Sequence, residues 1–200
     1  MASSLFRLAI AAALLTVPAA LPAQRMSDGY EFLKAVRDAN GDKVTKILDK
    51  PGSRIINTRD DAGDGALHIV AKRGDSTYLR FLVARGADVN LADGRGNTPL
   101  MIAIGSSCFD CVDALIRLKA NINLGNASGE TPLIRAVQLR NMDLARTLLD
   151  AGANPDQRDV IAGLSAREYA ARDGRSPALT KLLADAPKAG STRGVSGPRL

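Results

Sequence analysis

The feature that most constrains the fold of this chain is a period of 33 residues between Leu67 and Asp156. Three sets of apolar residues recur at this interval: Leu67, Leu100 and Leu133; Leu82, Leu115 and Leu148; Ala87, Ala120 and Ala153. A fixed period of this length is typical of one supersecondary unit stacked on copies of itself, because each unit buries a face that its neighbour must cover. Such arrays usually recognise other molecules through a surface and are seldom enzymes.

Each period also carries the residue types of a turn followed by two helices. Aspartate or asparagine close to glycine indicates a turn, in which a positive φ costs glycine nothing. Thr98 is suited to cap the next helix and Pro99 suits the first turn of that helix. Gly86, at the other end of the unit, favours a left-handed end to the second helix. The segments that align in this way are 60–68, 93–101 and 126–134, with the endings 86–90, 119–123 and 152–156.

These segments resemble the ankyrin repeat, whose motif reads Gly-x-Thr-Pro-Leu-His-x-Ala and closes on Gly-Ala-x-x-Asn. The resemblance implies an all-α solenoid of about five helix-turn-helix repeats with short β-turn fingers, extending over residues 24–186. The predicted repeats are 27–59 as an amino-terminal cap, 60–92, 93–125, 126–158, and 159–186 as a carboxyl-terminal cap.

The two outer repeats depart from the pattern, as terminal repeats should. In the first, Gly41 and Asn57 stand 33 residues before Gly74 and Asn90. In the last, the step from Gly129 to Gly163 is 34 residues, which predicts one extra residue in the turn around 160–161. Arg167 stands where the motif has a core leucine, consistent with a final repeat that has no neighbour to cover.

The first 23 residues predict a secretory signal peptide. Arg7 is their only charge, an apolar run covers 8–17, and Leu21-Pro22-Ala23 offers a cleavage site after Ala23. The run is shorter than the roughly 20 residues that span a bilayer, so cleavage and a periplasmic or secreted bacterial protein without stable membrane insertion are expected. An uncleaved anchor is the alternative. Residues 187–200 are poor in apolar residues and are predicted to be a disordered tail.

The charge of the chain gives no support to a nucleic-acid partner. The formal net charge is +6, or +5 without Arg7, and charges of both signs alternate along the sequence. Such alternation is typical of a solvated surface, whereas a nucleic-acid site would require a block of basic residues.

Cys108 and Cys111 are the one reactive constellation in the sequence. Three readings stay open: a structural disulfide in an oxidising compartment, two reduced thiols, or a redox pair. Two cysteines without a second pair of ligands cannot complete a four-coordinate zinc site, so no metal or other cofactor is expected. His68 occupies the histidine of the repeat motif, which the resemblance implies to be structural, and no nucleophile stands at a recognisable spacing from it. The chain is therefore not expected to be an enzyme.

The resemblance implies that a partner binds the concave face formed by finger tips and helix ends. Lys72, Arg73 and Arg95 are expected to form a cationic cluster that suits an acidic segment of a partner protein. The candidate partner-binding residues are Asp61, Asp64, Lys72, Arg73, Arg95, Asn97, Ser128, Glu130, Gln138, Leu139, Val160, Ile161 and Arg172.

The predicted function is non-catalytic protein binding in the periplasm. Two alternatives of other classes remain: a thiol–disulfide protein acting through Cys108 and Cys111, and an inhibitor or immunity protein for an exported enzyme.

Overall fold

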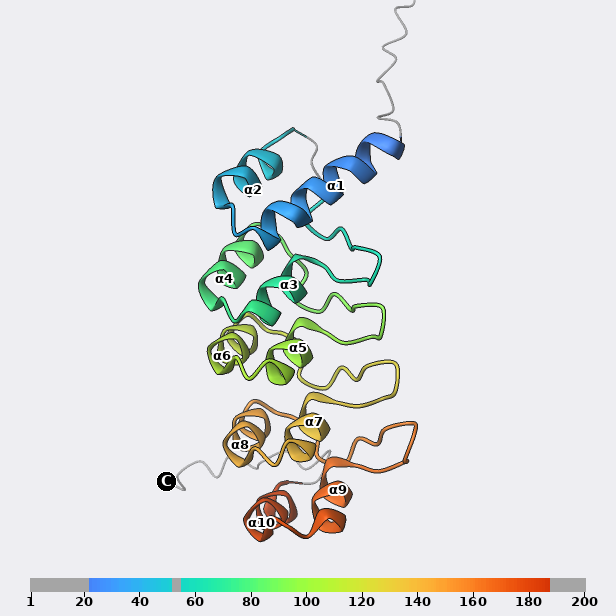
Figure 1. Ribbon diagram of the computed structural model, residues 1–200. Helices are drawn as coiled ribbons and strands as arrows, with labels where there is room; N and C mark the ends of the chain where they lie inside the picture. Colours follow the sequence, from blue (N-terminus) through green and yellow to red (C-terminus); the bar gives the residue numbers. More distant parts are fainter. Residues whose placement is uncertain (1–21, 52–54, 188–200) are drawn as a thin grey trace, which may run out of the picture.

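The computed structural model describes residues 22–51 and 55–187, and this part of the chain forms ten α-helices arranged as five stacked pairs (Figure 1). The helices are α1 (Pro22–Arg37), α2 (Gly41–Leu48), α3 (Ala66–Arg73), α4 (Ser76–Ala84), α5 (Pro99–Gly105), α6 (Phe109–Arg117), α7 (Pro132–Gln138), α8 (Met142–Asp150), α9 (Ala166–Asp173) and α10 (Pro177–Asp185). In the described residues the only β pairing is an isolated bridge between Arg158 and Ser165. The all-α solenoid predicted from the sequence is confirmed.

Side chains fix the first residue of several helices, as the sequence predicts. The Thr98 and Thr131 hydroxyls accept hydrogen bonds from backbone N–H groups three residues later, and a proline follows each threonine. Asp75 and Asn141 cap α4 and α8 in the same way. These bonds satisfy backbone donors that have no partner inside the helix.

The helices form two rows with the hydrophobic core between them. The odd-numbered helices lie between the even-numbered row and the connecting segments, which project to one side (Figure 1). The periodic leucines are almost wholly buried between the rows, and the periodic alanines nearly so. Each odd-numbered helix packs against the next one along the stack, so the core is continuous over all five pairs.

Two kinds of connection alternate along the chain. Short loops join each odd-numbered helix to its even-numbered partner, and we call their row the loop edge. Longer segments join each even-numbered helix to the next odd-numbered one, and we call 59–65, 92–98, 125–131 and 158–165 the first to fourth fingers. Because each helix from α2 to α9 runs between a finger and a loop, the fingers and the loop edge lie at opposite ends of the helices.

The first repeat differs from the sequence alignment. The left-handed residue in its loop is Ala39, which corresponds to Gly74 in the next repeat, while Gly41 is the first residue of α2. This step is 35 residues, not 33. Asn57, by contrast, does correspond to Asn90, because both side chains accept a backbone N–H from the following repeat. Two extra residues therefore lie between Asn40 and Asn57, and the predicted match of Gly41 to Gly74 is wrong.

The finger of the last repeat contains the extra residue that the sequence predicts, and Arg167 makes specific polar contacts in this repeat. The backbone N–H of Asp159 binds the carbonyl of Leu164, one residue further than in the other fingers, which confirms the predicted insertion. The Arg167 guanidinium pairs with Asp156 and donates to the carbonyls that end α10. An arginine thus closes the end of the stack where a leucine would have no neighbour.

The predicted terminal segments fall largely outside the described residues. Residues 1–21 of the predicted signal peptide and 188–200 of the predicted tail are not described, while Pro22 and Ala23 are the first residues of α1. Among the helices that are described, none is both long and apolar enough to span a membrane.

Candidate protein-binding surface

The base of every finger is held by one side chain. In the second finger, Asp93 Oδ1 accepts hydrogen bonds from the backbone N–H groups of Arg95 and Asn97, each at 2.8 Å. The corresponding residues in the other three fingers accept two backbone N–H groups in the same way: Asp60, Asn126 and Asp159. Aspartate and asparagine favour such turns because their short side chains reach the backbone two residues ahead. Each finger therefore has a fixed shape.

The fingers also bind one another through their backbones. The N–H groups of Gly94, Ala127 and Val160 donate to the carbonyls of the preceding finger at 2.9 to 3.0 Å. The accepting carbonyls belong to Ala62, Arg95 and Ser128. Four fingers thus form one continuous platform beside the odd-numbered helices.

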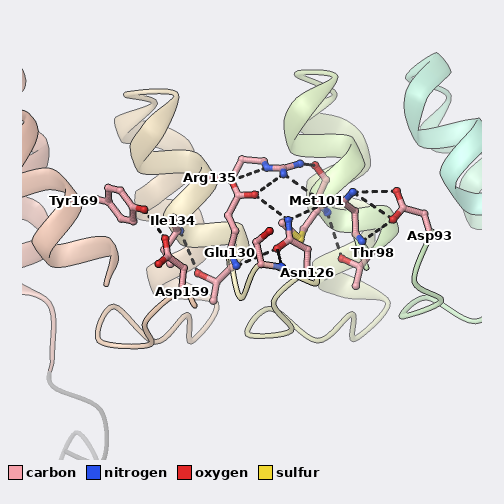
Figure 2. Close-up of polar contacts among 12 residues, drawn as sticks. Asp93, Thr98, Met101, Asn126, Glu130, Ile134, Arg135, Asp159 and Tyr169 are labelled. Atoms are coloured by element: carbon pink, nitrogen blue, oxygen red, sulfur yellow. Dashed lines mark hydrogen bonds and ion pairs between the residues drawn. The ribbon is translucent and has the colours of Figure 1, made fainter. Parts of the chain in front are cut away.

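A polar network stiffens the middle of this platform, as Figure 2 shows. The Asn126 amide donates to Asn97 Oδ1 at 3.1 Å and to Glu130 Oε2 at 3.0 Å. The Arg135 guanidinium binds both Glu130 oxygens, at 3.0 and 2.6 Å. Burial alone would raise the pKa of Asp93, but hydrogen bonds from the side chain and backbone of Asn97 outweigh it and lower that pKa. Asp93 is therefore held as an anion, and charge-assisted bonds link two fingers and α7.

His68 performs a similar structural task between the first two fingers. Its side chain is fully buried; Nδ1 accepts the Gly65 N–H at 3.0 Å, and Nε2 lies 3.0 Å from the Asn97 carbonyl oxygen. Burial lowers the pKa of His68, so the ring is neutral and Nε2 donates to that carbonyl. The structural role implied by the sequence resemblance is what the geometry shows.

A groove of about 330 Å³ runs between the first three fingers and the odd-numbered helices. It brings together residues from α3, α5, α7 and three fingers: Ala62, Asp64, Lys72, Asp93, Arg95, Asn97, Ile102, Asn126, Ser128 and Arg135. Five of the candidates from the sequence are among them: Asp64, Lys72, Arg95, Asn97 and Ser128. Glu130 lies behind the groove and holds Arg135.

Several candidates have other tasks in this structure. Asp64 and Asn97 line the groove but are only 9% and 6% exposed, and their side chains bind neighbouring groups. Lys72 pairs with Asp64. Arg73 donates to the Val36 carbonyl at 2.9 Å, at the end of α1.

The structure brings two of the three expected cations, Lys72 and Arg95, into the lining of one groove and directs Arg73 to the end of α1. Lys72 and Arg73 are drawn toward different partners, and Arg95 is left as the exposed cation that makes no ion pair with a described residue.

The remaining candidates lie apart from the groove. Val160 and Ile161 are 74% and 79% exposed at the tip of the fourth finger, and Asp61 is exposed on the first. Gln138, Leu139 and Arg172 lie at the loop edge, at or just beyond the ends of α7 and α9.

Sequence reasoning missed four residues that line the groove: Asp93, Ile102, Asn126 and Arg135. The recurrence of Asp or Asn at 60, 93, 126 and 159 was the available signal for two of them.

Cys108 and Cys111 are joined as a disulfide in the structure, with Cα atoms 5.2 Å apart, in the first turn of α6. Cys108 takes the capping position of that helix, and its Sγ lies 3.2 Å from the Cys111 backbone N–H that it accepts. Cys111 is wholly buried. The pair lies at the loop edge, away from the groove.

Comparisons with known proteins agree on one family. The sequence profile of the family described as "Ankyrin repeats (3 copies)" matches residues 32–126 and 67–159, which together cover more than half of the chain. An ankyrin repeat-containing protein of Treponema pallidum is 34% identical over 136 residues, which are 68% of this chain and 34% of that relative.

Two further relatives match shorter stretches. An ankyrin repeat protein of Fowlpox virus is 41% identical over 51 residues, covering 26% of this chain and 27% of its own length. An ankyrin repeat-containing protein of Schizosaccharomyces pombe is 38% identical over 68 residues, covering 34% of this chain and 32% of its own. The chain thus spans about a third or less of the length of these curated relatives.

Proposed function

This chain belongs to the ankyrin repeat family, and from that premise we propose that it is an exported, non-catalytic module that binds a partner protein in the groove between its fingers and odd-numbered helices. Ankyrin repeats serve protein–protein interaction, and the finer assignment of surface, partner and compartment is our own.

The observation that carries the choice of surface is the rigidity of the groove. Its polar groups are fixed by the Asx turns, the finger-to-finger backbone bonds and the Asn97–Asn126–Glu130–Arg135 network. Groups held before binding lose little entropy on association, which favours affinity. Ile102 adds an apolar element to the lining and Ser128 a hydroxyl.

Arg95 gives the groove its preference for an acidic partner. Its exposed guanidinium lines the groove and makes no ion pair with a described residue, so it is available to a carboxylate of the partner. Lys72 and Arg135 are already neutralised by Asp64 and Glu130. We therefore expect one acidic side chain to meet Arg95, without a broadly acidic partner surface.

The test is an in-cell crosslinking capture of the tagged protein, with partners identified by mass spectrometry. Arg95→Glu should lower recovery of the partner about tenfold, since it places like charges together at a contact. The matched control is Arg80→Glu, which makes the same charge change at an exposed residue of α4. Equal recovery of the partner by both variants, with equal melting temperatures, would remove the groove from consideration.

The same capture separates a binding module from an inhibitor. If the partner is an exported enzyme, its activity is measured at a one-to-one ratio with this protein. Retained activity supports a scaffold or localising role, whereas loss of activity identifies an inhibitor or immunity protein.

Export is proposed from residues 1–23 alone, through their single charge and apolar run. Amino-terminal sequencing of the protein recovered from a periplasmic extract is expected to begin at Gln24. A chain that keeps Met1 and sediments with membranes would instead show an uncleaved anchor.

A further inference from the structure

The Cys108–Cys111 pair occupies a position that neighbouring repeats fill without sulfur. Asp75 and Asn141 cap α4 and α8 by accepting the N–H of the residue three positions later, at 2.8 and 2.9 Å. Cys108 Sγ accepts the Cys111 N–H in the same geometry. Because an aspartate or asparagine starts the equivalent helix equally well, the start of α6 does not require a disulfide.

The Cys108–Cys111 disulfide also joins no two elements that are otherwise separate in the fold. Cys108 caps the nine-residue helix α6 and Cys111 lies in its first turn, three positions later in sequence. In the chain-entropy account, a disulfide stabilises a protein mainly by closing a long loop of the unfolded chain. This one closes a very short loop and ties no second helix or finger to α6, so a structural role explains it poorly.

The two cysteines differ in how deeply they are buried. Cys108 is half-buried at the loop edge, with exposed Ser107 before it and Phe109, 50% exposed, after it. Cys111 is fully buried in the core. Of the two, Cys108 is therefore the cysteine nearer to an incoming thiolate.

The helix favours the reduced form of the pair at Cys108. A sulfur that carries negative charge at this position would lie at the amino-terminal end of α6 and accept the Cys111 N–H as a charge-assisted bond. The disulfide sulfur accepts the same N–H without that charge. Folding therefore stabilises the product of reduction more than it stabilises the disulfide.

A groove lies between α6 and α8, and it includes Phe109, the residue that follows Cys108, but not Cys108 itself. Phe109, Val112 and Leu144 supply its apolar lining. Asp113 and Asp143 place carboxylates in the same lining.

We propose that Cys108–Cys111 is an exchange-active disulfide that oxidises a dithiol of another protein, with Cys108 as the sulfur that is attacked. A partner thiolate attacks Cys108 Sγ; the S–S bond breaks, and its electron pair leaves on Cys111 Sγ, which takes up the proton that the partner's second thiol gives up. The second partner thiolate then attacks the partner sulfur of the mixed disulfide and releases Cys108 as a thiolate. The partner dithiol becomes a disulfide, and the Cys108–Cys111 pair gains the two electrons. This activity does not depend on the binding groove proposed above.

The first test asks which sulfur exchanges, with oxidised glutathione as the probe. Cys111→Ala keeps the core apolar and leaves Cys108 alone, while Cys108→Asn installs the capping residue of the next repeat and leaves Cys111 alone. Thermal melting by circular dichroism verifies that both variants are folded. Intact mass should show a mixed disulfide forming at least about tenfold faster on Cys111→Ala. Equal rates, or faster reaction of Cys108→Asn, would overturn the assignment of Cys108.

The second test asks whether folding favours the reduced pair. The wild-type chain is equilibrated in buffers of reduced and oxidised glutathione, both folded and unfolded in guanidinium, then quenched with acid and alkylated. The folded pair should be half-reduced in a buffer about tenfold more oxidising than the unfolded pair requires. A folded midpoint equal to the unfolded one, or more reducing, would mean that the disulfide is a structural link and would overturn the proposal.

Discussion

The fingers and the loop edge of this solenoid both contain residues with positive φ, but neighbouring groups constrain the two edges differently. Finger and loop alike contain a residue with positive φ in every repeat. At the fingers this residue is always glycine: Gly63, Gly96, Gly129 and Gly163. At the loop edge the corresponding residues are Ala39, Gly74, Ser107, Arg140 and Gly174.

The reason for the difference is the distance to the next repeat. A Cβ added to Gly63 or Gly96 would lie 2.3 or 2.5 Å from a backbone nitrogen of the following finger. A Cβ on Gly74 would find its nearest neighbour, Cys108 Sγ, at 3.9 Å. Stacking thus excludes a Cβ at these positions where another finger follows; Gly163 has no following finger, and a Cβ there would meet nothing within 4 Å. At the loop edge, residues as different as glycine, alanine, serine and arginine adopt the same conformation.

The largest expected effect comes from a pair of variants that separates the steric clash of a new Cβ from the strain of a positive φ. Gly96→Ala should lower the free energy of unfolding by about 3 kcal/mol, because the new Cβ meets Ala127 and displaces its bond to the preceding finger. Gly86→Ala is the control: its φ is also positive at 94°, but a Cβ there meets nothing within 4 Å, so a loss of about 1 kcal/mol is expected. Urea unfolding measures both, and equal losses would show that stacking does not constrain the fingers.

Removal of the arginine that closes the stack should have the next largest effect. Arg167→Met loses the pair with Asp156 and leaves the carbonyls at the end of α10 without their donor, which should cost about 2 kcal/mol. Arg175→Met removes an exposed pair with Asp173 and should change stability by less than about 0.5 kcal/mol. Thermal or urea unfolding of both variants is the measurement. A small loss of stability in Arg167→Met would mean that the last repeat does not depend on the contacts of this arginine.

His68 makes the finger edge sensitive to mild acid. Its pKa is lowered in the folded protein, so between that pKa and 6.5 the unfolded chain binds more protons. The free energy of unfolding should be level above pH 7 and should fall as the pH drops below 6.5, by up to about 1.4 kcal/mol per pH unit. His68→Met, which copies the residue at 101, should remove this slope in urea titrations between pH 7 and 5.5. A slope that persists in the variant would assign it to other groups, since the sequence has one histidine.

The smallest expected effect is a gain at the loop edge. Ser107→Gly should raise the free energy of unfolding by up to about 1 kcal/mol, because φ of Ser107 is 55° and glycine adopts that conformation without a Cβ penalty. Arg140→Gly relieves the same strain but loses the ion pair with Asp173, so its net effect should be close to zero. A loss of stability in Ser107→Gly would show that this loop is constrained after all.

Local sequence signals predicted the stacked helices well. The Thr-Pro pairs at 98 and 131 cap helices as expected, and Cys108 caps α6 at the position that Asp75 takes in the preceding repeat. The first repeat was misaligned by two residues because it lacks the Thr-Pro-Leu signature, and a chance glycine at 41 kept the 33-residue spacing. Spacing alone cannot distinguish a structural equivalent from a coincidence.

The binding surface was less predictable, because the direction of a turn residue depends on the next repeat. Asp64 and Asn97 have the polarity of exposed tips, yet both are turned inward to bonds with neighbouring residues. Arg73 has a partner at the end of α1, which is 36 positions away in sequence. These contacts arise from stacking, so they cannot be predicted from the residues of a single repeat.

The extra residue of the fourth finger shows how such a scaffold can acquire new parts. Val160 still donates to Ser128, and Gly163 still closes the turn with a positive φ, so the added residue is accommodated wholly at the tip. A longer peptide grafted between Ile161 and Ala162 would leave the bond from Val160 to the third finger in place, while separating Asp159 from the Ala162 and Gly163 N–H groups that it accepts. The entropic cost of such a loop grows by only about 0.6 kcal/mol for each doubling of its length. This tip is a natural point for displaying a foreign epitope or for acquiring a new specificity by insertion.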